Sequence, residues 1–342
     1  MKRVTLKDLA KSLNTTIATV SRALHDHPEI SDNMKNRVKE AAALYNYKPN
    51  TTALSLKFKK SYRFGVIFPR LTHYYLAQIL SGMLSQATKA GYKMIIAESN
   101  YNPEKEMELI QEFYELDVDA ILILPSRKLG SQKAKLEKLI RTDIPFVIID
   151  RLIHFKKLKT PLISSNDDIG TKEGIVHLID QGYKKIAHLR GLSSSTIATV
   201  RVDAYLDTLK AHHMEFHKNW LLTCKKFNQN EGEKLAKQLM EMDNRPDAIF
   251  CVSDNVALGV IRGLKKMGIR VPEDVGVLGF SNSDLAQVSS PSLSSIHQPG
   301  RKIGIRSIKM VLSNIDDKID ISEEHLIMKT RLVVRKSTMK KG

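Results

Sequence analysis

The chain has 342 residues, of which 42% are hydrophobic and 27% are charged, and this length suffices for two or three domains with full cores. Its 54 lysines and arginines against 37 acidic residues give a formal net charge of +17, which favours association with nucleic acid. The N-terminus lacks the apolar core of a signal peptide, and no apolar run approaches the length of a membrane span. We therefore expect a cytoplasmic protein without a membrane partner. The two cysteines, Cys224 and Cys251, indicate reduced thiols rather than a disulfide or a metal site.

The first 48 residues predict three short helices. Thr5 and Asp8 have the spacing of a capping box at the start of the first helix, and Thr16 and Ser31 are placed to cap the second and third. Two short helices that cross at a small residue, here Ala10, are typical of a helix-turn-helix. Apolar residues at helical spacing predict the shared core: Leu6, Leu9, Ala10, Leu13, Val20, Ala23, Leu24, Met34, Val38, Ala41, Ala42 and Tyr45.

The outward face of the second helix carries the side chains that would meet DNA. Arg22 can donate twice to a guanine, while Ile17 and Ala18 can only contact thymine methyl groups. A plain helical subdomain with a surface arginine is the alternative, but residues 1–60 hold twelve Lys/Arg against five Asp/Glu, which favours DNA binding. Hydroxyl groups suited to phosphate oxygens come from Thr5, Thr16, Thr19 and Ser21.

Residues 49–60 follow as a basic linker with the composition of a hinge helix. Pro49 ends the third helix, and Asn50 can cap a short fourth one, which is too short to be stable alone. Leu56, flanked by small and basic residues, suits insertion into a minor-groove step. We expect Asn50, Ala53 and Leu56 to contact DNA, and the alternative is a plain linker.

From residue 61 onward, short apolar runs alternate with amphipathic helices, a pattern that predicts parallel sheets of the doubly wound kind. A break at 159–161 divides this region into two similar halves. The predicted strands are 63–68, 92–97, 120–124, 146–149, 162–164, 185–189, 248–252 and 275–280. The predicted helices are 75–90, 105–114, 170–181, 202–212, 231–242, 255–267 and 301–314.

Polar residues at strand ends mark the cleft between the halves as the expected ligand site, because ligands of such folds bind at the carboxyl ends of the strands. Asp150 closes the strand 146–149, Asp254 closes the strand 248–252, and Arg201 starts a helix after a serine-rich loop. Carboxylates together with an arginine can accept from and donate to sugar hydroxyls. The alternatives are a capping or inter-lobe role for Asp150 and capping of the helix 255–267 for Asp254.

Motifs of enzymes on doubly wound folds are missing from the sequence. There is no GxGxxG after the first strand, no GxxxxGK[ST], no GxSxG around the serine-rich loop, and no His or Cys cluster at metal spacing. We therefore expect no catalysis, no cofactor and no metal. A transport-type sugar-binding protein is excluded by the headpiece and the missing signal peptide.

The headpiece run VTLKDLAKSLNTTIATVSRALHDHPEISDNMKNRVKEAAALYNYKPNTTALSLK resembles the DNA-binding domain of the LacI/GalR family of bacterial regulators without a gap. The resemblance implies that Ile17, Ala18 and Arg22 read bases and that Leu56 intercalates at the operator centre. The body also resembles the family's periplasmic-binding-protein-like core, in phrases such as FGVIFP, KKIAHLRG and PDAIFCVSDNVALGVIRGLKKMGIRVPEDVGVLGF.

This resemblance implies an effector site and a domain plan. The residues matching Asp150, Arg201 and Asp254 contact effector in many family members, and Tyr75 would stack on it. Phe227 matches an aromatic residue that lines the site in some relatives, with core packing as the equal alternative. The implied plan is a headpiece over 1–48, a hinge over 49–60 and a core over 61–342. Within the core, the N-lobe would hold about 61–161 and 293–321, and the C-lobe about 162–292 and 322–337.

The core departs from the family pattern at several polar positions. Ser281, which we expect to contact the effector, stands where an aspartate is common, and Ser253 stands where an amide is common. Asn166-Asp167 inverts a frequent Asp-Asn pair, so a less hydroxyl-rich, larger or partly anionic ligand is suggested. We expect a homodimeric repressor of carbohydrate-utilisation genes that binds a near-palindromic operator and responds to a sugar or sugar phosphate. Control by a protein co-effector is the alternative.

Overall fold

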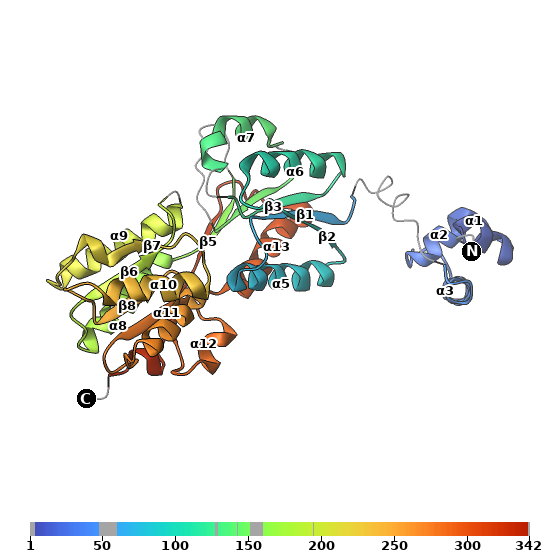
Figure 1. Cartoon of the computed structure of the whole chain (residues 1–342). Coiled ribbons are helices and arrows are strands. Elements are labelled where there is room, and N and C mark those ends of the chain that lie inside the picture. Colours follow the sequence, from blue (N-terminus) through green and yellow to red (C-terminus); the bar gives the residue numbers. More distant parts are fainter. Residues whose placement is uncertain are drawn as a thin grey trace. The chain divides into compact units, whose positions relative to one another are not determined.

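The computed structural model describes residues 4–47, 60–126, 129–141, 143–150, 160–193 and 195–340. The chain divides into two compact units, Met1–Tyr62 and Arg63–Gly342. The first consists of short helices and the second of layered sheets and helices (Figure 1). Each unit is described by itself below, as the headpiece and the core.

The headpiece contains α1 (Leu6–Ser12), α2 (Ile17–Leu24) and α3 (Asp32–Leu44). The three predicted caps are confirmed. The hydroxyls of Thr5, Thr16 and Ser31 accept from the backbone N–H three residues later, and Asp8 completes a capping box with Thr5. Such caps satisfy N–H groups that have no partner inside the helix.

The headpiece core is small and mostly as predicted. Its fully buried members are Leu9, Ala10, Val20, Ala23, Val38 and Ala41. Tyr45, which we expected in this core, is 47% exposed, because α3 ends at Leu44 and Tyr45 already lies outside the helical stripe. Asn46 then adopts a left-handed conformation, the Tyr47 N–H bonds to the Ala42 carbonyl at 2.8 Å, and Tyr47 packs on the core instead.

The first sheet of the core has six strands in the order β11-β5-β4-β3-β1-β2, and every pairing is parallel. The strands are β1 (Arg63–Phe68), β2 (Lys93–Glu98), β3 (Ala120–Ile123), β4 (Phe146–Ile149), β5 (Leu162–Ser165) and β11 (His325–Met328). The helices of this lobe are α5 (Tyr74–Lys89), α6 (Pro103–Glu115), α7 (Lys133–Leu139) and α13 (Gly300–Asp317), with a 3-10 turn η1 at Leu129–Gln132.

The second sheet has the order β12-β10-β9-β8-β6-β7, and its edge strand β12 runs antiparallel to β10. The strands are β6 (Ile186–Arg190), β7 (Leu221–Thr223), β8 (Ala248–Cys251), β9 (Gly276–Ser281), β10 (Ser294–His297) and β12 (Arg331–Val333). The helices are α8 (Asp167–Asp180), α9 (Thr196–Ala211), α10 (Gln229–Met240), α11 (Asp254–Lys266) and α12 (Asp284–Val288), with 3-10 turns η2 at Lys218–Trp220 and η3 at Lys336–Thr338. Two lobes of the doubly wound type are therefore confirmed.

The expected lobe boundaries are wrong for β5, β10 and β11. We assigned residues from 162 to the C-lobe, but β5 pairs with β4 in the first sheet. We assigned 293–321 to the N-lobe, but β10 pairs with β9 in the second sheet. We assigned 322–337 to the C-lobe, but this range holds β11, which lies in the first sheet, as well as β12, which lies in the second. Strand pairing depends on distant residues, so the sequence pattern located most strands without indicating which sheet takes them.

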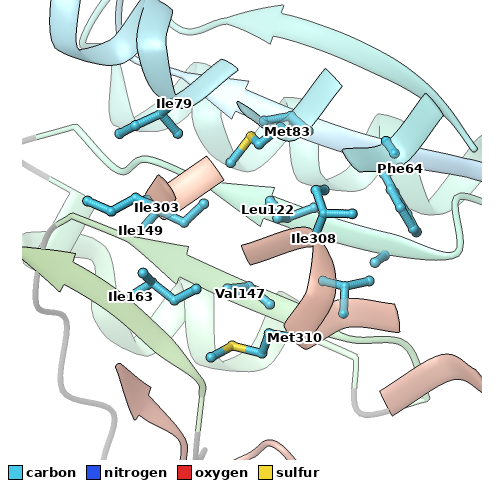
Figure 2. Packing of buried hydrophobic residues seen from close by; sticks show 14 of the residues in the cluster. Phe64, Ile79, Met83, Leu122, Val147, Ile149, Ile163, Ile303, Ile308 and Met310 are labelled. Carbon is cyan, nitrogen blue, oxygen red and sulfur yellow. The ribbon is translucent and has the colours of Figure 1, made fainter. Parts of the chain in front are cut away.

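Within the first lobe, α5 and α13 pack on each other and on one face of the sheet. Figure 2 shows this apolar layer, where residues of the two helices meet the strands. Labelled there are Phe64, Ile79, Met83, Leu122, Val147, Ile149, Ile163, Ile303, Ile308 and Met310. The two backbones touch at glycines, because a Cβ on Gly82 would lie 2.1 Å from the Arg301 carbonyl oxygen and one on Gly304 2.0 Å from the Ile79 carbonyl oxygen.

Gly82→Ala tests this close approach. Alanine favours an isolated helix over glycine by about 1 kcal/mol, but here it must push α13 away, so we expect a net loss of about 1–3 kcal/mol in the free energy of unfolding. Thermal unfolding followed by circular dichroism measures this loss. Thr88→Ala, an exposed change in the same helix, is the control. A melting temperature for Gly82→Ala equal to or above that of the control would contradict the packing described.

Candidate DNA-binding and effector sites

The outward face of α2 presents most of the residues predicted to meet DNA. Ile17, Ala18 and Arg22 are exposed, and Val20 and Ala23 are buried on the opposite side. Among the hydroxyl residues, Thr5 and Thr16 are exposed, while Thr19 and Ser21 are half-buried. Asn50, Ala53 and Leu56 lie outside the described residues.

Arg22 forms an ion pair with Glu29 at 3.2 Å, and both side chains are more than half exposed. An exposed pair of this kind is worth about 0–1 kcal/mol. Arg22 can therefore exchange Glu29 for a guanine edge at little cost in free energy.

The threonine hydroxyls are engaged in the caps. Thr5 donates its only hydroxyl proton to Asp8 at 2.7 Å, so it can donate to a phosphate only by releasing that carboxylate. Thr16 and Thr19 share one hydrogen bond of 2.9 Å, which leaves one of the two hydroxyl protons for a phosphate. The capping arrangement thus limits which of these hydroxyls can position DNA.

The core contains a cavity of about 1440 Å³ lined by residues of both lobes. All six residues predicted to bind effector lie along it: Tyr75, Asp150, Arg201, Phe227, Asp254 and Ser281. Tyr75 comes from the first turn of α5, and Asp150 follows β4. Asp254 begins α11 and Ser281 ends β9. The ends of strands and the starts of helices thus bring these side chains together.

Arg201 is buried and points into a polar network rather than into open solvent. It lies in the second turn of α9, which begins at Thr196, so our expectation that Arg201 starts the helix is wrong. Its Nε and Nη2 donate to Asp167 Oδ2 at 3.0 and 2.6 Å, and its Nη1 donates to the Val252 carbonyl at 3.0 Å. The guanidinium carbon lies 3.5 Å from the ring centre of Phe280.

Asp167 is the functional candidate that the sequence reasoning missed. Its other carboxylate oxygen accepts from the Ser165 hydroxyl at 2.6 Å and from Gln298 Nε2 at 3.1 Å. Gln298 Oε1 in turn accepts from the Ser281 hydroxyl at 3.2 Å. A signal for Asp167 was present in the sequence, because this residue lies two positions after the end of β5, at the same carboxyl edge of the sheet as Asp150.

Tyr75 and Asp150 form a pair on the first-lobe side of the cavity. The Tyr75 hydroxyl donates to Asp150 Oδ1 at 3.0 Å, and Asp150 adopts a left-handed backbone with φ of 73°. Burial, followed by the nearby carboxylates of Asp150 and Asp167, raises the pKa of the Tyr75 hydroxyl well above its usual value. Tyr75 is therefore a neutral hydrogen-bond donor whose ring is held in place.

The alternative role that we considered for Asp254, capping of α11, is not the one it has. The cap of α11 is Ser253, whose hydroxyl accepts from the Val256 N–H, so Asp254 does not cap that helix. Its two carboxylate oxygens accept from the Ser295 hydroxyl and from the Ser283 N–H, both at 2.5 Å. Burial raises its pKa to about 6. Asp254 thus links α11 to Ser295 in β10 and to Ser283 in the segment between β9 and β10.

Two contacts join the lobes across the cavity. The Tyr74 hydroxyl donates to Asp284 Oδ1 at 3.1 Å, and the His73 ring meets the Phe227 ring edge-on at 5.8 Å between centroids. His188 also lines the cavity, and burial lowers its pKa to about 3, so the ring is neutral. Sequence reasoning found Phe227 but none of these partners.

Comparison with known proteins gives the family. Residues 5–50 match the family of bacterial regulatory proteins named lacI, and residues 175–338 match a periplasmic binding protein-like domain. The HTH-type transcriptional repressor PurR of Vibrio vulnificus is 30% identical over 343 residues, which cover 98% of this chain and 99% of that protein. The chain belongs to the LacI family of bacterial regulatory proteins.

Other LacI-family relatives extend this likeness. The regulator NtdR of the NTD biosynthesis operon in Bacillus subtilis is 26% identical, over 98% of this chain and 99% of that protein. The structure of the Lac repressor dimer bound to operator and the anti-inducer ONPF has a TM-score of 0.87 at 24% identity, over 99% of this chain and all of that one. The CelR–cellobiose complex has a TM-score of 0.73 at 22% identity, over 98% of this chain and all of that one.

The family confirms a helix-turn-helix headpiece with a two-lobed core, and it confirms a DNA-binding transcriptional regulator rather than an enzyme. Among the helices that the structure describes, none has the length and apolar character needed to cross a membrane. The described part of the chain also holds no group of three or more His, Cys, Asp or Glu side chains arranged for a metal ion.

Asp254→Asn tests the buried carboxylate. Because its folded pKa of about 6 exceeds the ordinary value of 3.8, the native state takes up this proton before the unfolded chain as the pH falls. When the pH falls from about 7.5 to about 5, the free energy of unfolding of the wild type should therefore increase by about 1 kcal/mol relative to that of Asp254→Asn. Denaturant unfolding at both pH values measures this difference, with the exposed change Asp203→Asn as control. An advantage of the wild type that stays constant or shrinks toward low pH would show that Asp254 titrates normally.

Proposed function

We propose that this LacI-family regulator is a homodimeric repressor in the cytoplasm that binds a near-palindromic operator and is controlled by a small sugar-like effector in the inter-lobe cavity. A two-fold dimer presents two headpieces to two half-sites, which requires an operator of matching symmetry. The lining of one cavity by Tyr75, Asp150, Arg201, Phe227 and Ser281 is the observation that carries the effector half of the proposal.

The relatives support both halves. One similar structure is a Lac repressor dimer bound to operator, and another is a regulator in complex with cellobiose. In this chain we assign base reading to Ile17, Ala18 and Arg22. We assign minor-groove contact to Asn50, Ala53 and Leu56, and phosphate contact to the hydroxyls of Thr5, Thr16, Thr19 and Ser21. An effector that binds one relative arrangement of the lobes better than another shifts the populations and thereby the DNA affinity.

Arg22→Ala tests the base-reading assignment. The variant should lose its preference for operator over random DNA and keep weak, salt-sensitive binding, because phosphate contacts remain. Fluorescence anisotropy with both DNAs at several salt concentrations measures this ratio. Arg37→Ala removes an exposed arginine from α3 and controls for charge alone. If Arg22→Ala loses the same affinity for operator as for random DNA, Arg22 does not contribute to sequence recognition.

A thermal-shift screen of sugars and sugar phosphates with the full-length protein tests the effector half. A ligand of the native state should raise the melting temperature further as its concentration increases, and the best ligand should then change operator affinity. If no small molecule shifts the melting temperature while operator binding stays normal, the effector proposal fails. Control by a protein co-effector then becomes the leading explanation.

A further inference from the structure

The charge of Arg201 is already matched by a carboxylate of the same chain. Arg201 and Asp167 are buried to about the same degree, with 8% and 6% of their side chains exposed, and their closest atoms lie 2.6 Å apart. Water screens such a pair far less than it screens a surface pair. A ligand that meets Arg201 therefore meets an ion pair with little net charge.

Asp167 is held so that it stays with Arg201. Ser165 and Gln298 donate to its second oxygen, and the Phe280 ring covers one face of the guanidinium. An anionic group of a ligand would have to approach Arg201 next to a fixed carboxylate. Separating a buried pair costs several kcal/mol, because it leaves a charge without compensation.

Arg201 still has donors for a neutral ligand. A guanidinium carries five N–H groups, and the contacts to Asp167 and Val252 use one each on Nε, Nη1 and Nη2. One N–H on each terminal nitrogen therefore remains for a hydroxyl or carbonyl oxygen. The cavity keeps the hydrogen-bonding capacity of Arg201 while its charge is neutralised.

The other charged groups along the cavity also disfavour an anionic ligand. Asp150 and Asp254 add carboxylates to its lining, and His188 is neutral. The cations Arg70, Lys225 and Lys226 also line it, but all three are exposed, where a contact to an anion is worth about 0–1 kcal/mol. The buried part of the cavity thus disfavours a phosphate or carboxylate.

We propose that Asp167 is a specificity-determining residue that restricts the effector site to uncharged, hydroxyl-bearing ligands by pairing with Arg201. Asp167 acts through Arg201 as a positioning residue, since it does not itself line the cavity. The inference rests on the proposed function of the cavity as the effector site. It replaces the sequence-based suggestion of a partly anionic ligand.

The test compares neutral sugars with their anionic counterparts on the full-length protein. Hexoses, pentoses and disaccharides are each paired with the matching uronate or sugar phosphate, and Kd is measured by calorimetry for every pair in which either member shifts the melting temperature. For the wild type, the neutral member should bind at least about tenfold more tightly. Asp167→Asn leaves the Arg201 charge unmatched. In this variant the Kd ratio, defined as the Kd of the anionic member divided by that of the neutral member, should fall by at least about tenfold.

One further variant separates this role from a structural one. Asp168→Asn removes a neighbouring charge from the same first turn of α8 and should leave the Kd ratio unchanged. If Asp167→Asn does not fold, the Kd ratio of the wild type decides the inference by itself.

Three outcomes would overturn the inference. The inference is contradicted if the wild type binds the anionic members more tightly than the neutral ones. It is also contradicted if Asp167→Asn does not change the Kd ratio. Both outcomes leave the proposed function intact. If Lys225→Ala or Lys226→Ala abolishes that anion binding, the exposed lysines set the preference instead. If neither member of any pair shifts the melting temperature while operator binding is normal, the proposed function fails, and the charge preference fails with it.

Discussion

The polar junction where the chain passes between the two sheets is the constraint on which the rest of the core depends. In the described residues, the passages lie after β5, after β10 and between β11 and β12. Asn166 Oδ1 accepts from the Thr330 N–H at 2.6 Å, and Asp167 accepts from Gln298. These bonds join all three passages to one another, so the segments that link the two lobes are held together at one place.

The same junction meets the cavity through two side chains. Arg201 binds Asp167 next to the first passage, and Ser281 binds Gln298 at the second. An effector that donates to or accepts from either side chain therefore acts on groups that also hold the lobes. Directional hydrogen bonds are suited to two discrete arrangements rather than to a continuous range, which is what a ligand-controlled switch requires.

Each lobe is tightly packed, so we expect conformational change to occur at the junction rather than inside a lobe. In the first lobe, α5 and α13 touch at Gly82 and Gly304, and in the second, a Cβ on Gly232 would lie 2.1 Å from the Val256 carbonyl oxygen. Close-packed helix pairs of this kind resist deformation. The lobes can therefore move as units while the polar junction between them rearranges.

The amino-acid sequence by itself determined the local elements. The caps at Thr5, Thr16 and Ser31 and the apolar runs of the buried strands depend on neighbours a few residues apart, so their pattern can be read directly. It also brought Asp150 and Arg201 into consideration, since Asp150 follows a predicted strand and Arg201 follows the serine-rich loop. Only the tertiary structure decided which sheet takes β5, β10 and β11, that Asp167 neutralises Arg201, and that Asp254 ties α11 to β10. The contacts of Asp167 with Arg201 and of Asp254 with Ser295 join residues 34 and 41 positions apart. Contacts of this kind and the pairing of strands arise from packing, which leaves no periodic signal in the chain.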